Sequence, residues 1–299
     1  APPAPPPRHP LASWLGPSFW GRTALTVGDY LILSFPLIFL AFAAAGLAVG
    51  MLFADVLGRT EVLDRIMGVF DSEFKGVQIP GQSEVASKLM LAMLRAKITQ
   101  VINRYVPEVK EQLYAQGLAK LFALELGPLL TALLLAGRIG GAYSGTVGTL
   151  QATQQNHLLQ NLGISPRMWT LGPAAIAAVI AAPILTLVGT TVALSAGGFV
   201  AQWYHLSGNE VYWDKVQTSL VDFDQDSFNW KVFPPIVLLY RSWGFIAIIL
   251  LVSEILSRWR KNLQPRNVSF VITSSVVCSS LLIIIADWGF SQLLVRSSA

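Results

Sequence analysis

Five long apolar runs, separated by polar stretches, dominate the chain. They cover residues 30–53, 117–135, 169–194, 233–256 and 268–294. Each run has roughly the ~20 residues that an α-helix needs to cross a hydrocarbon core about 30 Å thick. The pattern therefore predicts an all-α integral membrane protein with about five transmembrane helices.

The N-terminal third contains three segments of a different kind. Residues 1–10 are rich in proline and predict a disordered tail, and a cleaved organelle transit peptide would fit this start. Residues 11–25 combine two tryptophans with an arginine, which favours an interfacial helix in the lipid headgroup region over an ordinary loop. Residues 55–116 balance acids and bases, and their apolar positions in 83–106 recur at helical spacing. This stretch predicts an extramembrane helical insertion in a membrane domain that covers residues 26–299.

A second polar stretch separates the second and third apolar runs. Residues 148–159 are too polar for the bilayer core, so we expect an elbow or surface helix there, and we call this stretch the elbow. Between the third and fourth runs, residues 201–231 form an acidic and aromatic stretch that predicts a loop.

Composition and charge agree with a membrane protein and exclude several other classes. Hydrophobic residues make up 53% of the 299 residues and charged residues 13%, and the mean hydropathy is +0.55. The net charge of +4 does not indicate nucleic-acid binding, because the basic residues lie at the ends of apolar runs. The basic loop 257–267 then faces the cytoplasm, or the stroma or matrix, together with the elbow, and the acidic stretch 201–231 faces the opposite side.

Three charged positions within or beside apolar runs are candidates for function. Glu125 lies near the middle of the second run, and Arg138 follows it. A carboxylate at mid-bilayer is costly, so Glu125 is expected to contact a substrate path, to lock helices together, or to reach the membrane surface. Arg138 is either a partner across helices or an inside-facing anchor. For Asp287, in the last run, we expect a packing partner or a place near the outer face.

Glycines in the apolar runs favour close helix packing. Gly46 and Gly50 form a small-xxx-small pair, and Gly137 and Gly140 occur in a glycine-rich stretch. A nucleotide-binding loop is excluded, because no strand precedes that stretch and no Gly-Lys-Ser/Thr follows it.

Other chemistry has no support in the sequence. The three histidines are scattered without metal-ligand spacing, and Cys278 is the only cysteine, so neither a disulfide within the chain nor a cysteine-based metal site is expected. Asp222, Asp224 and Asp226 lack the glycine and distal glutamate of an EF-hand, so we interpret them as solvated loop acids. We expect no metal, no cofactor and no catalytic residue in this chain.

Five short motifs in the middle of the chain occur in a recognisable order. They are Glu125, Leu126 and Pro128; Ala136, Gly137, Arg138, Gly140 and Ala142; Gly148 and Thr149 with Thr153 and Gln155; Leu162, Gly163 and Pro166; and Pro183, Leu185 and Thr186. In this order and spacing, residues 118–186 resemble the Mla-type permease (MlaE) of MCE-associated ABC lipid transporters, a family with a chloroplast inner-envelope relative.

The resemblance implies a lipid permease that works with other subunits. Two copies would pair around an apolar cavity for a phospholipid or phosphatidic acid, with P-loop ATPase subunits under the elbows and MCE-domain proteins on the outer face. Any ATP with Mg would lie on the ATPase partner, because this chain has no Walker motif. The membrane would be a bacterial inner membrane or the inner membrane of a chloroplast or mitochondrion. The resemblance assigns Glu125, Pro128 and Arg138 to the lipid path or a helix lock, and it assigns to the partner-facing elbow Gly148, Thr149, Gln154, Gln155 and His157.

Departures from the family pattern leave a second interpretation open. The family usually carries acids where this chain has Thr146, Gln154, His157 and Ser165, and an arginine in place of Ala174. The stretch 55–116 is also longer than the usual connection. The alternative is a non-transporting subunit, derived from the permease, of a larger respiratory or photosynthetic membrane complex.

Overall fold

The computed structural model describes residues 17–58, 109–221, 233–259 and 264–298, with side chains up to residue 293. The predicted tail 1–10, most of the insertion 55–116 with its amphipathic stretch 83–106, and the three loop aspartates at 222, 224 and 226 lie outside the described residues.

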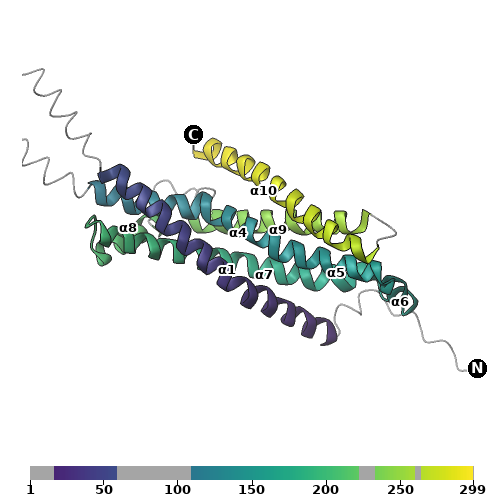
Figure 1. Ribbon diagram of the computed structural model, residues 1–299. Helices are drawn as coiled ribbons and strands as arrows, with labels where there is room; N and C mark the ends of the chain where they lie inside the picture. The colour runs from purple at the N-terminus through teal and green to yellow at the C-terminus, as the bar shows by residue number, and fades with distance from the viewer. Residues whose placement is uncertain (1–16, 59–108, 222–232, 260–263, 299) are drawn as a thin grey trace, which may run out of the picture. The chain divides into compact units, whose positions relative to one another are not determined.

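All regular structure in the described part is helical, which confirms the predicted all-α class (Figure 1). A helical stretch at 109–121 leads without a break into η2, and the elements in chain order are α1 (Pro17–Gly58), η2 (Phe122–Leu126), α4 (Gly127–Leu135), η3 (Ala136–Gly140), α5 (Gly141–Ala152), α6 (Gln155–Asn161), α7 (Pro166–Trp203), α8 (Asn209–Val221), α9 (Pro234–Trp259), η4 (Pro265–Asn267) and α10 (Val268–Ser298).

Within the described residues, five helical stretches are long and apolar enough to cross a membrane, as the sequence predicted. They are Phe19–Leu57, Val109–Ala152, Pro166–Trp203, Pro234–Trp259 and Pro265–Leu293. The first three have 39, 44 and 38 residues, close to twice the length that a hydrocarbon core of about 30 Å requires. These helices therefore extend well beyond the lipid.

Residues 11–16 of the predicted interfacial helix 11–25 lie outside the described residues, and no break follows residue 25 in the part that the structure describes. Residues 17–25 are the first turns of α1 and continue directly into the span, so they do not form a separate helix. The apolar residues that suggested an interfacial segment, such as Trp20, lie in a sequence with no helix breaker before the span; Pro36 is accommodated inside α1.

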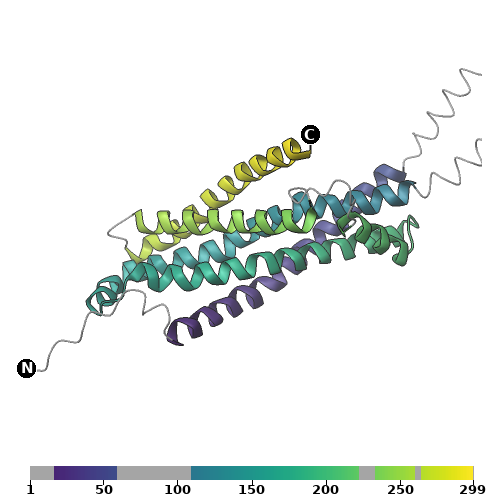
Figure 2. The ribbon, with the colours of Figure 1, turned by 180° about the vertical axis from the view of Figure 1, so that it is seen from behind.

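The described chain forms two compact units. Unit 1 comprises Ala1–Ala43, Leu121–Ala193 and Phe223–Ala299, and unit 2 comprises Ala44–Lys120 and Leu194–Asp222. In unit 1, α5, α9 and α10 pack along one another (Figure 2). Small residues permit this packing: a Cβ on Gly140 would lie 3.1 Å from Ile249 and Ser253 of α9, and Ser275 of α10 donates a hydrogen bond to Ser253 at 2.8 Å.

Two prolines in the spans of unit 1, Pro128 and Pro183, remove backbone donors that side chains of α9 replace. Pro128 has no N–H for the carbonyl of Leu124, four residues earlier, and Arg241 donates to that carbonyl instead. Pro183 likewise leaves the carbonyl of Val179 without its usual donor, and the indole of Trp243 donates to it at 3.2 Å. Backbone groups inside a bilayer have no water available, so such side-chain donors are required.

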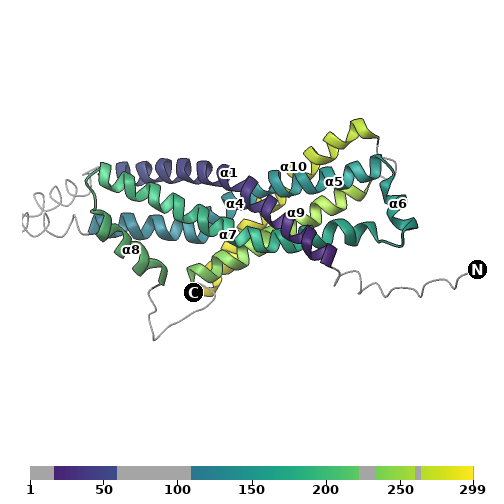
Figure 3. The same cartoon turned by 90° about the horizontal axis from the view of Figure 1, so that it is seen from below.

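Unit 2 is held together by buried tyrosines and close helix contacts. The hydroxyl of Tyr114 donates to the carbonyl of Gly197, and that of Tyr212 donates to the carbonyl of Leu194, both at 2.9 Å. A Cβ on Gly50 would lie 3.4 Å from the Cα of Gly197, so the C-terminal parts of α1 and α7 are in direct contact (Figure 3).

The interpretation of residues 201–231 as a loop is wrong for residues 209–221, which form α8. Tyr212 and Val216 lie one helical turn apart and are both buried, and this pair anchors the helix. The acidic residues around them obscured this short apolar periodicity.

Candidate functional site

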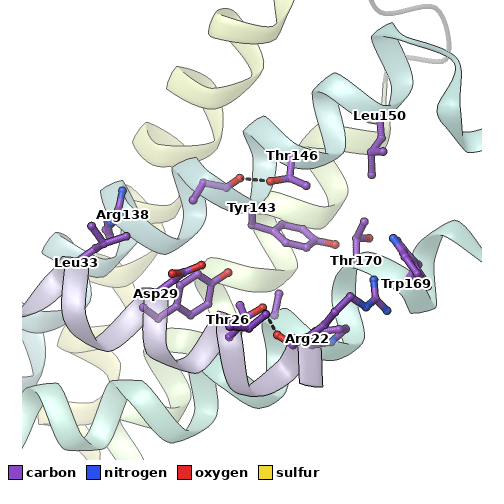
Figure 4. A pocket seen from close by; sticks show the side chains of 15 residues that line it. Arg22, Thr26, Asp29, Leu33, Arg138, Tyr143, Thr146, Leu150, Trp169 and Thr170 are labelled. Atoms are coloured by element: carbon purple, nitrogen blue, oxygen red, sulfur yellow. Dashed lines mark hydrogen bonds between the residues drawn. The ribbon is translucent and has the colours of Figure 1, made fainter. Parts of the chain in front are cut away.

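A cavity of about 500 Å³ opens in unit 1 between the first half of α1, the stretch from η3 through α5, and the start of α7 (Figure 4). Its apolar lining comes mainly from Leu25, Leu33, Leu150, Pro173 and Ala174. Its polar and aromatic lining comes from Arg22, Thr26, Asp29, Tyr30, Arg138, Tyr143, Thr146, Trp169 and Thr170. This volume falls in the range of roughly 300–1,000 Å³ that is common for sites of small ligands.

The cationic groups of the cavity come from two different elements. The guanidinium carbon of Arg22 on α1 lies 3.2 Å from the centre of the Trp169 ring on α7, which is a cation–π contact. Arg138 is supplied by the π-helical turn η3. Within the described residues neither arginine forms an ion pair, so both charges are available to a ligand.

A buried carboxylate lies directly behind one wall of the cavity. Glu254 of α9 has a side chain only 4% exposed; its Oε1 lies 2.5 Å from Nε of Arg258 and 2.9 Å from Nε of Arg167, and its Oε2 accepts a 2.5 Å hydrogen bond from the hydroxyl of Tyr143. Arg258 also donates to Thr170 at 3.3 Å. We call Glu254, Arg167, Arg258 and Tyr143 the Glu254 network; it joins α5, α7 and α9.

A second buried charge network surrounds Arg241, which has no exposed surface. Its guanidinium donates to Ser291 at 2.8 Å and to the backbone carbonyls of Asp287 and Leu124, and it lies 3.2 Å from the Asp287 carboxylate. We call this set the Arg241 network. The expectation of a packing partner for Asp287 is confirmed.

The structure separates the two charged residues that the sequence singled out. Glu125, in the π-helical turn η2, is exposed on the surface of the chain, whereas Arg138 is half-buried and lines the cavity. They are thirteen residues apart on one continuous helical stretch, or about 20 Å. Pro128 is buried. Because it has no N–H, the carbonyl of Leu124 lacks its usual helical donor, and Arg241 donates to that carbonyl.

The four glycines that the sequence analysis assigned to helix packing differ in burial. Gly46, Gly50 and Gly140 are buried, and a Cβ on Gly50 or Gly140 would come within 3.4 Å of an atom of a neighbouring helix. Gly137 is exposed, and a Cβ there would meet nothing within 4 Å, so within this chain it is not a helix-packing position.

The elbow is an exposed turn followed by a short helix. α5 continues to Ala152, Gln154 adopts a left-handed conformation with φ of 56°, and the seven residues of α6 include none that is buried. Gln154, Gln155 and His157 are therefore exposed, as is Thr149 near the end of α5. Gly148 is buried inside α5 instead and does not belong to the exposed surface.

Sequence reasoning missed Glu254 and Tyr143, and it treated Arg22 only as a surface anchor. The available signal was a glutamate inside the run 233–256, where a charge is as costly as in the second run. As for metals, the described residues contain no group of three or more histidine, cysteine, aspartate or glutamate side chains that could hold an ion.

The fold and these buried networks define an integral membrane protein whose interior carries paired charges and a ligand-sized cavity. The chain belongs to the MlaE permease family: the family model described as Permease MlaE matches residues 96–293.

Relatives from bacteria and from a chloroplast match the same region. A probable ABC transporter permease protein of Rickettsia typhi is 30% identical over 58% of this chain and 62% of its own length. The chloroplastic protein TRIGALACTOSYLDIACYLGLYCEROL 1 of Arabidopsis thaliana is 29% identical over 58% of this chain and 47% of its own. The intermembrane phospholipid transport system permease protein MlaE of Haemophilus influenzae is 28% identical over 63% of this chain and 71% of its own. The chain thus spans about half to two thirds of the length of the first two relatives.

We predicted an integral protein of a bacterial, chloroplast or mitochondrial inner membrane. The family, its relatives and the five apolar helices of the described residues support an integral inner-membrane protein in bacteria or chloroplasts.

Proposed function

We propose that this chain is the membrane permease subunit of an ABC-type lipid transporter. Membership of the MlaE family supports this, as do the names of two relatives, a phospholipid transport permease and a probable ABC transporter permease. The observation that carries the proposal is the exposure of Glu125: its side chain lies on the surface of the single chain, within the candidate span Val109–Ala152.

An exposed carboxylate at that depth requires a polar or protein environment. An acidic side chain facing lipid near the bilayer centre costs about 2.5–3.5 kcal/mol on insertion scales. A second copy of the chain, or a wet path between two copies, removes this cost. We therefore infer a homodimer in which Glu125 faces the partner copy and borders the path of a phospholipid or phosphatidic acid.

Energy for transport would come from a partner, because we assign no catalytic residue to this chain. The elbow is the surface that we assign to a P-loop ATPase, with an MCE-domain protein on the opposite face of the membrane. Residues 139–166 contain no Asp, Glu, Lys or Arg, so this contact would rest on amide groups and on the exposed Leu158 and Leu162 rather than on ion pairs.

The uncharged elbow also favours a second candidate function. A permease that lost its charged coupling surface could serve as a structural subunit of a respiratory or photosynthetic complex.

Purification of the tagged chain from its native membrane, in mild detergent, distinguishes the two candidates. Two copies recovered with a P-loop ATPase and an MCE protein in stoichiometric amounts support the transporter. Recovery with respiratory or photosynthetic subunits and without an ATPase overturns it.

A substitution at Glu125 tests the observation that carries the proposal. Glu125→Leu should insert into the membrane at normal levels but lose dimerisation or lipid transfer. Glu210→Leu removes an exposed carboxylate from α8, outside the spans, and is the matched control. Unchanged dimerisation and transfer in Glu125→Leu would remove this residue from the lipid path.

A further inference from the structure

The cavity between α1, α5 and α7 differs in position from the path proposed above. All fifteen of its lining residues belong to unit 1 of a single chain, and Glu125 is not among them. The exposed carboxylate lies about 20 Å along the helix from Arg138, which lines the cavity. A ligand in this cavity would therefore not require a second copy of the chain.

The lining matches an amphiphile rather than a soluble metabolite. Leucine, proline and alanine side chains line an apolar part. Arg22 lies beside Trp169 and Thr170 at one end of the cavity, and Arg138 lies beside Leu33 at the other (Figure 4). The charged groups are Arg22, Arg138 and Asp29, which leaves a net charge of +1. An anionic headgroup would complement the positive charge, and an acyl chain joined to it would lie against the apolar side chains.

Arg22 has an unused donor at this site. Its Nε is buried and has no hydrogen-bond partner within the described residues, while its guanidinium carbon lies 3.2 Å from the centre of the Trp169 ring. A buried N–H without an acceptor is costly, and a phosphate oxygen is the acceptor that a guanidinium binds best.

The neighbouring arginines are already occupied. Arg167 and Arg258 both contact Glu254, so that carboxylate neutralises charge behind the wall formed by Tyr143. The cations directed to a ligand are thus the two that line the cavity.

From the residues around it, we infer that the cavity lies at the depth of lipid headgroups. Trp169 is in the first turn of α7, just after the elbow, and Arg22 is near the start of α1. Tryptophan and arginine concentrate at the membrane–water interface, and the basic residues around 257–267 mark this side as cytoplasmic or its organelle equivalent.

We propose that this cavity binds one glycerophospholipid from the leaflet on the elbow side, with its phosphate on Arg22 and the start of an acyl chain against Leu25, Leu150 and Pro173. This binding does not depend on transport, on an ATPase or on dimerisation.

The test is native mass spectrometry of the purified full-length chain after delipidation and titration. The added ligands are phosphatidylglycerol, diacylglycerol with the same acyl chains, and glycerol 3-phosphate. The variants are Arg22→Gln, which removes the unused donor, and Ala142→Phe, which fills the cavity from an exposed position on α5. Arg266→Gln is the matched control, because it removes one exposed cation on the same side without lining the cavity.

The expected result is one phosphatidylglycerol per chain, with affinity at least about tenfold lower in Arg22→Gln and Ala142→Phe and unchanged in Arg266→Gln. Diacylglycerol and glycerol 3-phosphate should each bind at least about tenfold more weakly than the intact phospholipid to the wild-type chain.

Three results would overturn the proposal. Equal binding of diacylglycerol would show that the phosphate is not recognised, and equal binding of glycerol 3-phosphate would show a soluble phosphate site. Unchanged affinity in Ala142→Phe would place the lipid elsewhere, and this variant keeps the test decisive if Arg22→Gln fails to fold. None of these results bears on Glu125 or on ATPase recovery, so the transport proposal stands or falls separately.

Discussion

Arg241 and Glu254 are thirteen residues apart on α9 and are both almost completely buried, yet they are stabilised by different kinds of partner. Arg241 donates to two backbone carbonyls and one hydroxyl, and it pairs with a single carboxylate. Glu254 contacts only side chains, namely two guanidiniums and a phenol. One network is balanced in charge, and the other carries an excess of one positive charge.

The two networks therefore have different functions: the Arg241 network satisfies the backbone, and the Glu254 network supports one side of the cavity. The Arg241 network satisfies a carbonyl that Pro128 leaves without a donor, so backbone geometry alone requires it. The Glu254 network satisfies no backbone group of that kind, and it lies against the cavity through Tyr143 and Thr170. We therefore expect the two networks to differ in how much unfolding free energy a single substitution removes, and in how much of it a second substitution restores.

The largest expected effect is that of Arg241→Met. It leaves Asp287 unpaired and the Leu124 carbonyl without a donor, which should cost about 3–5 kcal/mol of stability. Denaturant unfolding in detergent micelles measures it. Adding Asp287→Leu should recover a large part, because an apolar pair often replaces a buried ion pair at little cost. A single variant as stable as wild type would contradict this account of the network.

A smaller loss is expected for Tyr143→Phe in the Glu254 network. The hydroxyl gives Glu254 its only described contact on Oε2, at 2.5 Å, and a hydrogen bond to a charged group contributes roughly 1.5–3 kcal/mol. The same unfolding assay applies, with Tyr30→Phe as control at another tyrosine of the cavity. Equal losses of stability at the two tyrosines would mean that the hydrogen bond to Glu254 adds no measurable stability.

A double-mutant cycle with Pro128→Ala tests whether Arg241 replaces the backbone donor that the proline removes. Alanine supplies the N–H that the Leu124 carbonyl lacks, so Arg241→Met should be less harmful in this background, with a coupling of about 1 kcal/mol. Comparison of the unfolding free energies of the wild type, both single variants and the double variant gives this coupling. Strict additivity would show that the proline does not create the need for Arg241.

The smallest effect is expected for Arg167→Gln. Although this residue contacts Glu254 at 2.9 Å, its side chain is 67% exposed, so water already screens the pair. The loss should stay below about 1 kcal/mol, and it should shrink further in high salt. A loss as large as that of Arg241→Met would show that the exposed arginine is essential to the network.

The parts of the fold that follow from local pattern were predictable from the sequence. The five spans depend on runs of apolar residues, and the elbow depends on polar residues between them. Asp287 was expected to need a partner because an isolated charge in an apolar helix is costly. The boundary expected after residue 25 does not exist in the described part of α1, because nothing there stops the helix.

The candidate site depends on contacts between distant parts of the chain, so little of it could be predicted. Glu254 meets Tyr143 and Arg167, which are 111 and 87 residues away in sequence, and no local spacing indicates that encounter. The cavity likewise exists only where α1, α5 and α7 converge. That Gly137 is exposed and Gly148 buried could not be predicted for a related reason, since the face of the helix on which each lies is set by packing and by the two π-helical turns nearby.

Phospholipid movement by the intact complex tests the central claim most directly. The complex purified with its partners would be reconstituted into vesicles containing a fluorescent phospholipid, and extraction of that lipid would be followed with and without ATP. The account predicts ATP-dependent movement that is lost in Glu125→Leu and retained in Glu210→Leu. An intact, ATP-hydrolysing complex that moves no lipid, or a Glu125→Leu complex that moves it at the wild-type rate, would contradict the account.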